Sequence, residues 1–504
     1  MEKNKVFVIN MNLKALPVAV IILGVITAIC GFFKEDLNVM TWGMLVVWLG
    51  NMIYAVENFQ RRFFFFIFNC TFFTFILGRA FFGYFKGEEW WRELQQAYEN
   101  NLFAVTAIIL SLISIFAGAV LAELFFDRKV ERKSLLTEKK KEFVINLQAS
   151  ALLVFYITMF FAFIQEGEKL VFLLSGKSYL DFYTSFQPAL PSLVYTIASF
   201  MKYSLCIYLA TMPRKWRAFP LLVLYILTGV PSFIIGMRNP VIQNMIFVLA
   251  YYVFRNITDN KEKWLGKFEK IAIAVAVPIG IVFLAAYAFI RSDMKIDKGV
   301  LGLFVDFFYG QGITINVLTR GYGYQYNLPQ FPFRNYTFGG IIDYFLHGTV
   351  GQKIFGTVAL PSYNCYENAR MSNNLSHGLS YLILKDDYLN GQGVGSCYIM
   401  ENYIDFGYMG VVLFSLLIGV LLIFFMRGME KNVLVNTIIL VSLTGIFYIP
   451  RAEATGWLTF ICTAQFWVCV AGCYLAAWIL GKWKWMRNLF AKLKIVQTDY
   501  PSSS

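Results

Sequence analysis

Apolar runs of about twenty residues recur from one end of the chain to the other, and they restrict the fold more than any other feature. A helix needs roughly 20 apolar residues to cross the hydrocarbon core of a bilayer. The run at residues 241–254 is the shortest, and it either spans the membrane or re-enters on one side. The sequence predicts twelve membrane-spanning helices, at residues 15–33, 38–56, 63–85, 102–122, 143–165, 190–212, 219–237, 241–254, 271–290, 406–426, 432–450 and 454–481.

The composition agrees with a membrane protein. Charged residues make up 15% of the 504 residues and hydrophobic residues 58%, whereas a soluble domain carries about 25% charged residues. Disordered, fibrous and soluble single-anchor classes are therefore excluded. We expect an all-α polytopic membrane protein in three parts: a membrane domain of nine spans at residues 1–290, a large extracytoplasmic loop at 291–405, and three spans with a basic tail at 406–504.

Lysine and arginine are concentrated in alternate connections, most densely at residues 128–141. Positively charged residues remain preferentially on the cytoplasmic side of a membrane. This pattern predicts that both termini are cytoplasmic and that the loop at 291–405 is on the outer face. The net charge of +13 therefore reports topology. We expect the anionic inner leaflet, rather than a nucleic acid, to be the partner of these cations.

The long connection between Arg291 and Asp405 is the candidate functional region. It holds 115 residues, including twelve of the 29 tyrosines. Connections of this length without secondary structure of their own are usually functional or disordered, and this one is not of low complexity. Tyrosine combines a flat apolar face with a hydroxyl group, which suits stacking on sugar rings or a membrane-interface belt. The residues leave both interpretations open.

Both histidines of the protein lie in this connection. His347 is interpreted as an ordinary loop residue. His377 lies in the segment Ser-His-Gly-Leu-Ser-Tyr381, which the glycine-rich segment 391–396 follows. Histidine titrates near neutrality and is the commonest general base. Glycines at alternate positions, among them Gly393 and Gly395, let backbone N–H groups approach an anion closely.

Four arginines lie at positions predicted to be on the outer side, against the usual charge bias. An arginine fork matches phosphate oxygens, although an interfacial side chain that reaches for water is the simpler alternative. Arg79 and Lys202 fall within predicted spans, where they serve either substrate binding or helix packing. Cysteine and histidine spacing matches no metal site, and no cofactor is expected. The outer arginines are Arg238, Arg291, Arg370 and Arg451.

The segment 375–422 resembles the Wzy-type oligosaccharide repeat-unit polymerases, which build O-antigen, capsular or exopolysaccharide chains. The similar features are the motif around His377, Gly-Gln-Gly-Val-Gly-Ser396, the segment Glu401 to Gly410, and the Gly-Met-Arg238-Asn-Pro turn. The resemblance implies a GT-C-like, metal-independent glycosyltransferase in the bacterial cytoplasmic membrane. Its donor and acceptor would be polyprenyl-diphosphate-linked oligosaccharides, and its further partners a flippase and a chain-length regulator.

The resemblance also implies roles for single residues. His377 would be the general base, with Glu401 or Asp405 as the second candidate. The four outer arginines would stabilise the leaving diphosphate, while Gly393, Gly395 and Tyr381 would position sugars. The related O-antigen ligases have arginine or histidine followed by glycine eleven positions later. Here Arg291 and Gly302 match that pattern, whereas His377 is followed by Tyr388.

Three alternatives to a polymerase follow from the same residues. An O-antigen ligase would share the donor chemistry and differ in its acceptor. A lipid-linked oligosaccharide flippase or other carrier would have repeated halves and short outer loops. A sensor or structural membrane protein would tolerate loss of His377. Cys365 and Cys397, which both lie in the outer loop at 291–405, could also pair in a disulfide.

Overall fold

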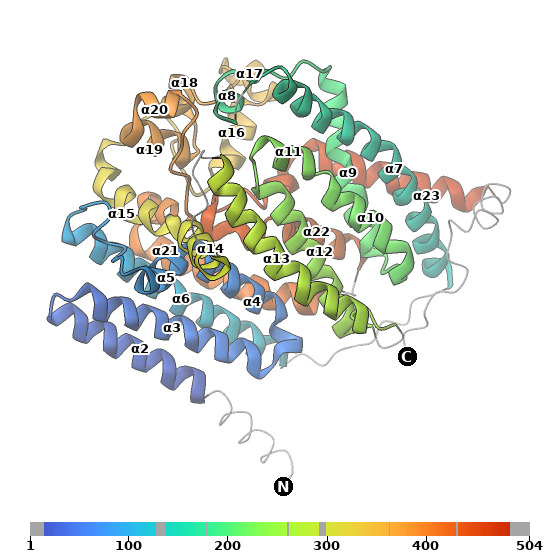
Figure 1. Cartoon of the computed structure of the whole chain (residues 1–504). Helices are drawn as coiled ribbons and strands as arrows, with labels where there is room; N and C mark the ends of the chain where they lie inside the picture. Colours follow the sequence, from blue (N-terminus) through green and yellow to red (C-terminus); the bar gives the residue numbers. More distant parts are fainter. Residues whose placement is uncertain are drawn as a thin grey trace, which may run out of the picture.

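The computed structural model describes residues 15–127, 138–177, 179–259, 262–291, 299–361, 363–429 and 432–483. Helices make up 80% of the structure, and the described residues contain no strand. The predicted all-α class is therefore confirmed. Long helices form one bundle, and a group of short helices gathers over one of its ends (Figure 1).

In the described part of the chain, twelve α-helices and a π-helical turn precede residue 292. Local sequence explains some of their ends: the Asp36 carboxylate accepts hydrogen bonds from the Asn38 and Val39 N–H groups and so begins the second of these helices. The elements are α2 (Ala15–Phe33), α3 (Leu37–Glu57), α4 (Phe59–Phe72), the π-helical turn η1 (Phe73–Leu77), α5 (Gly78–Lys86), α6 (Tyr98–Asp127), α7 (Glu138–Leu174), α8 (Tyr179–Ser185), α9 (Ser192–Ala210), α10 (Lys215–Leu227), α11 (Val230–Ile235), α12 (Asn239–Thr258) and α13 (Lys267–Arg291).

The remaining elements follow residue 298. They are α14 (Val300–Gln311), η2 (Gly312–Thr314), α15 (Ile315–Tyr324), η3 (Gln325–Asn327), α16 (Gly339–His347), α17 (Thr349–Phe355), α18 (Tyr366–Met371), α19 (Leu375–Leu384), α20 (Asp386–Leu389), α21 (Tyr398–Gly428), α22 (Val433–Leu443), η4 (Ile446–Arg451), η5 (Thr459–Cys462) and α23 (Ala464–Lys482).

Small residues allow the long helices to pack closely. A Cβ atom on Gly118 of α6 would lie 2.0 Å from the Leu416 carbonyl oxygen of α21, and one on Gly419 would lie 2.1 Å from the Ile115 carbonyl oxygen. Such contacts bring helix backbones together where lipid offers no hydrophobic drive for association. The α6–α21 pair therefore forms a tight centre for the bundle.

Twelve helical segments of the described chain are long and apolar enough to cross a membrane. Each predicted span except 241–254 overlaps one of them. The segments are Ala15–Phe33, Leu37–Glu57, Phe59–Lys86, Tyr98–Phe126, Glu142–Leu174, Ser192–Ala210, Lys215–Ile235, Lys267–Tyr287, Val300–Asn327, Tyr398–Gly428, Val433–Arg451 and Ala464–Lys482.

Helix α12, which contains the predicted span 241–254, is absent from that set, yet its contacts show that it runs the length of its neighbours. Near one end, Arg238 donates to the Leu284 carbonyl oxygen at 3.2 Å. At the other, Arg255 donates to the Pro213 carbonyl oxygen at 3.1 Å, where α10 begins. One end of α12 thus lies beside the end of α13, and the other lies beside the start of α10. Helix α12 therefore runs along the bundle and does not turn back within it.

The segment Val300–Asn327 was not expected, because the connection at 291–405 was predicted to lack a span. Its hydropathy of 1.3 is the lowest of the twelve, and α14 and α15 are separated by the 3₁₀ turn η2. On α14, Phe308 stacks on Phe82 at 5.2 Å. At η2, a Cβ atom on Gly312 would lie 2.0 Å from the Arg79 nitrogen. Helix α14 therefore begins near the end of α5 and ends near η1, which lies in the middle of the candidate span Phe59–Lys86.

Helix α15 then returns toward the end from which α14 came. Tyr322 stacks on Phe103 at 4.4 Å, and Gly323 lies against the Asn100 side chain at the start of α6. The start of α6 and the end of α5 are joined by a short connection, so both arms point to the same end of the bundle. Residues 300–327 therefore form a re-entrant hairpin, a backbone arrangement that membranes tolerate where it is buried in protein or lines a cavity.

Residues 328–397, which we name the cap, follow the hairpin and contain α16 to α20. The cap and α8 lie over one end of the bundle, while the start of α2 and the end of α23 lie away from it (Figure 1). The Thr337 N–H donates to the Asp405 carboxylate at 2.6 Å, and Thr455 donates to the Thr337 carbonyl oxygen at 2.7 Å. The predicted long loop is thus a folded hairpin and cap held on the bundle.

Candidate functional site

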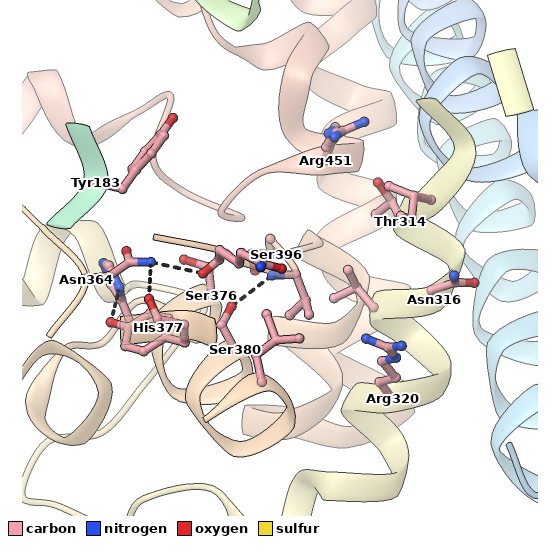
Figure 2. A pocket seen from close by; sticks show the side chains of 18 of the residues that line it. Tyr183, Thr314, Asn316, Arg320, Asn364, Ser376, His377, Ser380, Ser396 and Arg451 are labelled. Carbon is pink, nitrogen blue, oxygen red and sulfur yellow. Dashed lines mark hydrogen bonds between the residues drawn. The ribbon is translucent and has the colours of Figure 1, made fainter. Parts of the chain in front are cut away.

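A cavity of about 700 Å³ lies between the cap and the bundle. The hairpin, the η4 segment and the α5–α6 connection line it from the bundle side, whereas α19, α20 and the glycine-rich segment line it from the cap (Figure 2). Polar groups dominate its wall. Those from the cap are Asn364, Ser376, His377, Ser380, Tyr388, Gln392 and Ser396, α8 adds Tyr183, and those from the bundle are Glu93, Asn239, Thr314, Asn316, Arg320, Tyr448 and Arg451.

His377 lies on the first turn of α19. Asn374 begins this helix by accepting a hydrogen bond from the Ser376 N–H at 2.9 Å, which places the His377 ring in the cavity wall. Its Nδ1 atom is 2.8 Å from the Tyr388 hydroxyl oxygen. Burial lowers the pKa of His377 to about 4, so the imidazole is neutral at pH 7 and can accept a proton.

Two arginines face this cavity from separate elements. Arg451 at the end of η4 donates through Nη1 to the backbone and side-chain oxygens of Gln311, each at 3.1 Å. Arg320 lies on α15, across the cavity from His377 (Figure 2). In the described part of the chain, the Arg320 guanidinium makes no hydrogen bond or ion pair. Both side chains therefore keep donors available for an anion.

The cavity wall contains one carboxylate among the described residues, Glu93, and a partner neutralises it. Arg79 donates through Nε and Nη2 to the two Glu93 oxygens at 2.8 and 2.5 Å. Arg79 also lies over the Tyr309 ring, with 4.3 Å between Cζ and the ring centroid. With Glu93 paired, the charges of Arg320 and Arg451 remain, and the cavity suits an anionic ligand.

The glycine-rich segment 391–396 forms one edge of the cavity. Gly391 has a φ of +94°, and a Cβ atom there would lie 2.6 Å from the Leu180 carbonyl oxygen, so only glycine fits. The Val394 N–H donates to the Ser380 hydroxyl at 2.9 Å. Among the described residues, the N–H groups of Gly393 and Gly395 have no acceptor. Both glycines line the cavity, as the anion-binding interpretation requires.

Glu401 lies behind the wall and does not line the cavity. Its side chain is fully buried in α21. One carboxylate oxygen accepts from the Ser396 hydroxyl at 2.5 Å, and the other accepts from the Ala454 N–H at 2.7 Å. Glu401 therefore joins the glycine-rich segment to the chain that follows Arg451. This geometry favours a positioning role over the expected role as a second general base.

Other predicted site residues are also outside the cavity. The Asp405 carboxylate caps the Thr337 N–H at 2.6 Å, and Arg238 reaches α13, although its neighbour Asn239 lines the cavity. Arg370 is exposed on α18. Tyr381 packs its ring between two other tyrosines, with centroid distances of 5.5 and 6.0 Å. Arg291 ends α13, and its side chain lies outside the described residues.

Four further residues that the sequence singled out lie away from the cavity. His347 is the last residue of α16 rather than a loop residue, and its Nδ1 atom is 2.7 Å from the Val358 carbonyl oxygen. Lys202 lies 5.5 Å from the Tyr203 ring centroid on α9, among packed helices. Cys365 and Cys397 are buried free thiols, so the disulfide considered from the sequence does not form here.

Arg320 and Glu93 are the charged cavity residues that sequence reasoning missed. Neither belongs to a recognisable motif, and Arg320 follows a glycine-interrupted apolar stretch that was interpreted as loop. Its only signal is an arginine inside a segment of hydropathy 1.3, since charged residues in membrane segments are functional candidates. Of the predicted residues, His377, Arg451, Gly393 and Gly395 meet in the cavity.

A neutral imidazole in a cavity that two arginines also line can take a proton from a hydroxyl group while an anion such as phosphate is held in the same cavity. Comparison with known proteins adds one finding. A family model described as O-antigen polysaccharide polymerase Wzy matches residues 16–484. No curated protein and no solved structure matches the chain.

Proposed function

Because the chain belongs to the Wzy family of O-antigen polysaccharide polymerases, we propose that it joins lipid-linked oligosaccharide repeat units in the cavity beneath the cap. The family match covers nearly the whole chain, and the twelve apolar helices agree with a multi-pass membrane protein. The observation that carries the assignment of the site is a neutral histidine facing two arginines with free donors in one cavity.

The arginines would hold the donor diphosphate. As the bond between the anomeric carbon and the diphosphate oxygen breaks, negative charge grows on the leaving group. Donors already oriented toward that charge stabilise the transition state more than the bound substrate. Arg451 is held by Gln311 and Arg320 extends from the hairpin, so both are available without rearrangement of a protein ion pair.

His377 would act as general base on the acceptor. A sugar hydroxyl of the second unit attacks the anomeric carbon and forms the new glycosidic bond. Its proton passes to the imidazole, and the polyprenyl diphosphate leaves with the electron pair of the broken bond. The bound diphosphate also raises the pKa of His377 from its low value in the empty cavity, because a nearby anion favours the imidazolium. The scheme requires no cofactor.

We place this chemistry on the outer face of the bacterial cytoplasmic membrane. The basic residues 128–141 make up the connection between α6 and α7 and the first turn of α7, and positively charged connections remain in the cytoplasm. The start of α2 and the end of α23 lie away from the cap in Figure 1, which supports an outer cap with cytoplasmic termini. A GT-C-like architecture, a surface-polysaccharide product, and a flippase and a chain-length regulator as partners belong to the same proposal.

The test compares glycans and extracted lipid-linked intermediates from cells that lack the protein and carry defined variants. We expect His377→Ala and Arg320→Ala to accumulate single lipid-linked units without long chains, at normal protein level. His347→Ala is the matched histidine control, and Arg92→Ala, whose side chain is 77% exposed, is the arginine control. Both controls should polymerise normally.

Other outcomes separate the alternatives. Long polymer that stays on the lipid carrier in the deletion strain would indicate a ligase. Units confined to the inner leaflet would indicate a flippase. Normal chain length in both His377→Ala and Arg320→Ala would remove the cavity assignment while leaving family membership unaffected.

A further inference from the structure

The hydroxyl group of Tyr388 contacts two partners at once. Its oxygen is 2.8 Å from His377 Nδ1 and 3.2 Å from the Cys365 carbonyl oxygen, to which it donates. A phenol has a single proton to donate, and a carbonyl oxygen can only accept. When both bonds are present, the Tyr388 proton is directed to Cys365. The hydroxyl oxygen must then accept from His377, which requires the histidine proton on Nδ1.

A neutral imidazole carries one proton, so Nδ1–H leaves Nε2 with a free lone pair. Nε2 has no hydrogen-bond partner among the described residues, and His377 lines the cavity. The ring nitrogen that can accept a proton is therefore the one left to a ligand. Orientation of a catalytic histidine through its second nitrogen is a general means of fixing the tautomer.

The surrounding chain holds Tyr388 firmly. The ring is 1% exposed, and the Asn364 side chain donates to the Tyr388 carbonyl oxygen at 2.9 Å. Cys365 is equally fixed, because its carbonyl oxygen also accepts from the Ala369 N–H at 3.1 Å at the start of α18. The hydroxyl thus lies between a rigid acceptor and the histidine, which limits its rotation.

A sharp turn brings Tyr388 to His377. Lys385 separates α19 from α20 with φ +50° and ψ −109°, a conformation that costs a non-glycine residue of the order of 1–3 kcal/mol. The turn folds α20 back over α19, so the residue eleven positions after His377 meets its ring. This is the position where the ligase-like pattern has glycine, and the tyrosine there makes a contact that glycine cannot make.

We propose that Tyr388 is the positioning residue that fixes His377 as its Nδ1–H tautomer and so presents Nε2 as the proton acceptor in the cavity. The tautomer assignment rests on hydrogen-bond geometry alone. Its catalytic meaning rests on the proposed function. Tyr388 exchanges no proton with substrate in this scheme.

The chain contains two histidines, which makes the tautomer directly measurable. We would record ¹⁵N spectra of ¹⁵N-histidine-labelled full-length protein carrying His347→Gln, so that His377 alone contributes. We expect a protonated Nδ1 and an unprotonated Nε2, assigned through couplings to the ring protons. A proton on Nε2 would overturn the proposal.

The Tyr388→Phe variant removes one hydroxyl group and keeps the ring. In the same background we expect a mixture of tautomers and a polymerisation rate that falls by at most about tenfold. This loss is smaller than the 10²–10⁴-fold contribution of a general base, because His377 itself remains. Tyr366→Phe, at an exposed ring, should change neither. Unchanged spectra in Tyr388→Phe would overturn the proposal. If that variant does not fold, the tautomer of the unaltered Tyr388 protein still decides the question.

The two hypotheses fail separately. An Nδ1–H tautomer together with normal polymerisation by His377→Ala would contradict the proposed function and leave the geometry standing. An Nε2–H tautomer together with inactive His377→Ala would contradict the role of Tyr388 alone.

Discussion

Arg79 holds Glu93 in a two-point ion pair, with Nε to Oε2 at 2.8 Å and Nη2 to Oε1 at 2.5 Å. Arg79 does not line the cavity, whereas Glu93 does. The pair therefore controls the charge of the cavity from behind its wall. An arginine inside a predicted span thus acts on the candidate site indirectly, through the acid that it neutralises.

Removing Arg79 should weaken donor binding, because Glu93 would then face Arg320 with no cation to neutralise it, although the Tyr309 hydroxyl still donates to it at 3.3 Å. We expect Arg79→Gln to raise KM for the lipid-linked donor roughly tenfold or less, since the Glu93 side chain is partly exposed and solvent screens it. The double variant Arg79→Gln/Glu93→Gln should recover most of the loss. Kinetics with reconstituted protein would measure this, and failure of the double variant to recover would assign Arg79 a packing role.

Glu401 can be distinguished as a positioning residue or a base by two substitutions. Glutamine can accept from the Ala454 N–H and donate to the Ser396 hydroxyl, so Glu401→Gln should retain most activity. Alanine leaves buried donors without acceptors, at a cost of about 1–3 kcal/mol for each group. Thermal unfolding and polymer length would be compared. Loss of polymer in Glu401→Gln at unchanged stability would instead support acid–base chemistry.

The pH dependence should differ between kcat/KM and kcat. Burial lowers the pKa of His377 to about 4 in the empty cavity, and the base is lost only as the pH falls through that value. The acidic limb of kcat/KM, which reports the free enzyme, should therefore lie near pH 4, well below the ordinary histidine value of about 6.5. The limb of kcat should lie higher, because bound diphosphate raises the pKa. If the acidic limbs of both pH profiles coincide near pH 6.5, burial does not lower the pKa of His377 in the free enzyme.

Replacing Lys385 by glycine should increase the stability of the protein against unfolding. Its φ of +50° with ψ −109° lies where glycine carries no Cβ penalty, so Lys385→Gly should stabilise the cap by about 1 kcal/mol. The matched change Lys353→Gly lies within α17 and should destabilise by up to about 1 kcal/mol. Thermal unfolding in detergent would measure both. A destabilised Lys385→Gly variant would show that this turn carries no strain.

The topology predicts two reporter results. A reporter fused after Lys353 of the cap should read extracytoplasmic, and one after Lys140 near the start of α7 should read cytoplasmic. A third fusion in the 262–266 connection tests α12, since a helix that crosses places this connection in the cytoplasm. An extracytoplasmic reading there would mean that α12 turns back. A cytoplasmic cap would place the proposed chemistry on the wrong face.

The class of protein and most of its helices follow from sequence alone. A run of about 20 apolar residues has one stable solution in a bilayer, because every backbone polar group must be paired within the segment. Charge asymmetry is a similar local signal. The hairpin at 300–327 was missed because its glycines and its Arg320 lower hydropathy, and burial between α5 and α6 compensates for that deficit in a way that no local pattern reveals.

The candidate site was only partly predictable. His377, Gly393 and Gly395 stood out because histidine is rare here and alternate glycines form a recognisable pattern. Whether an arginine enters the cavity depends on packing: Arg451 and Arg320 do, while Arg370 is exposed outside it. Sequence spacing carries no information about such distances once the chain turns back on itself.

Sequence by itself determined a polytopic helical membrane protein, its family resemblance and His377 as the first of three candidate bases. Only the tertiary structure decided which groups face that base, that Glu401 lies behind the wall, and that the Tyr388 hydroxyl contacts the Nδ1 atom of His377. The physical reason is the range of the forces involved. Hydrophobic transfer acts on each segment separately, whereas hydrogen bonds require atoms within about 3 Å of each other, and residues 377 and 388 meet because the Lys385 turn brings them together.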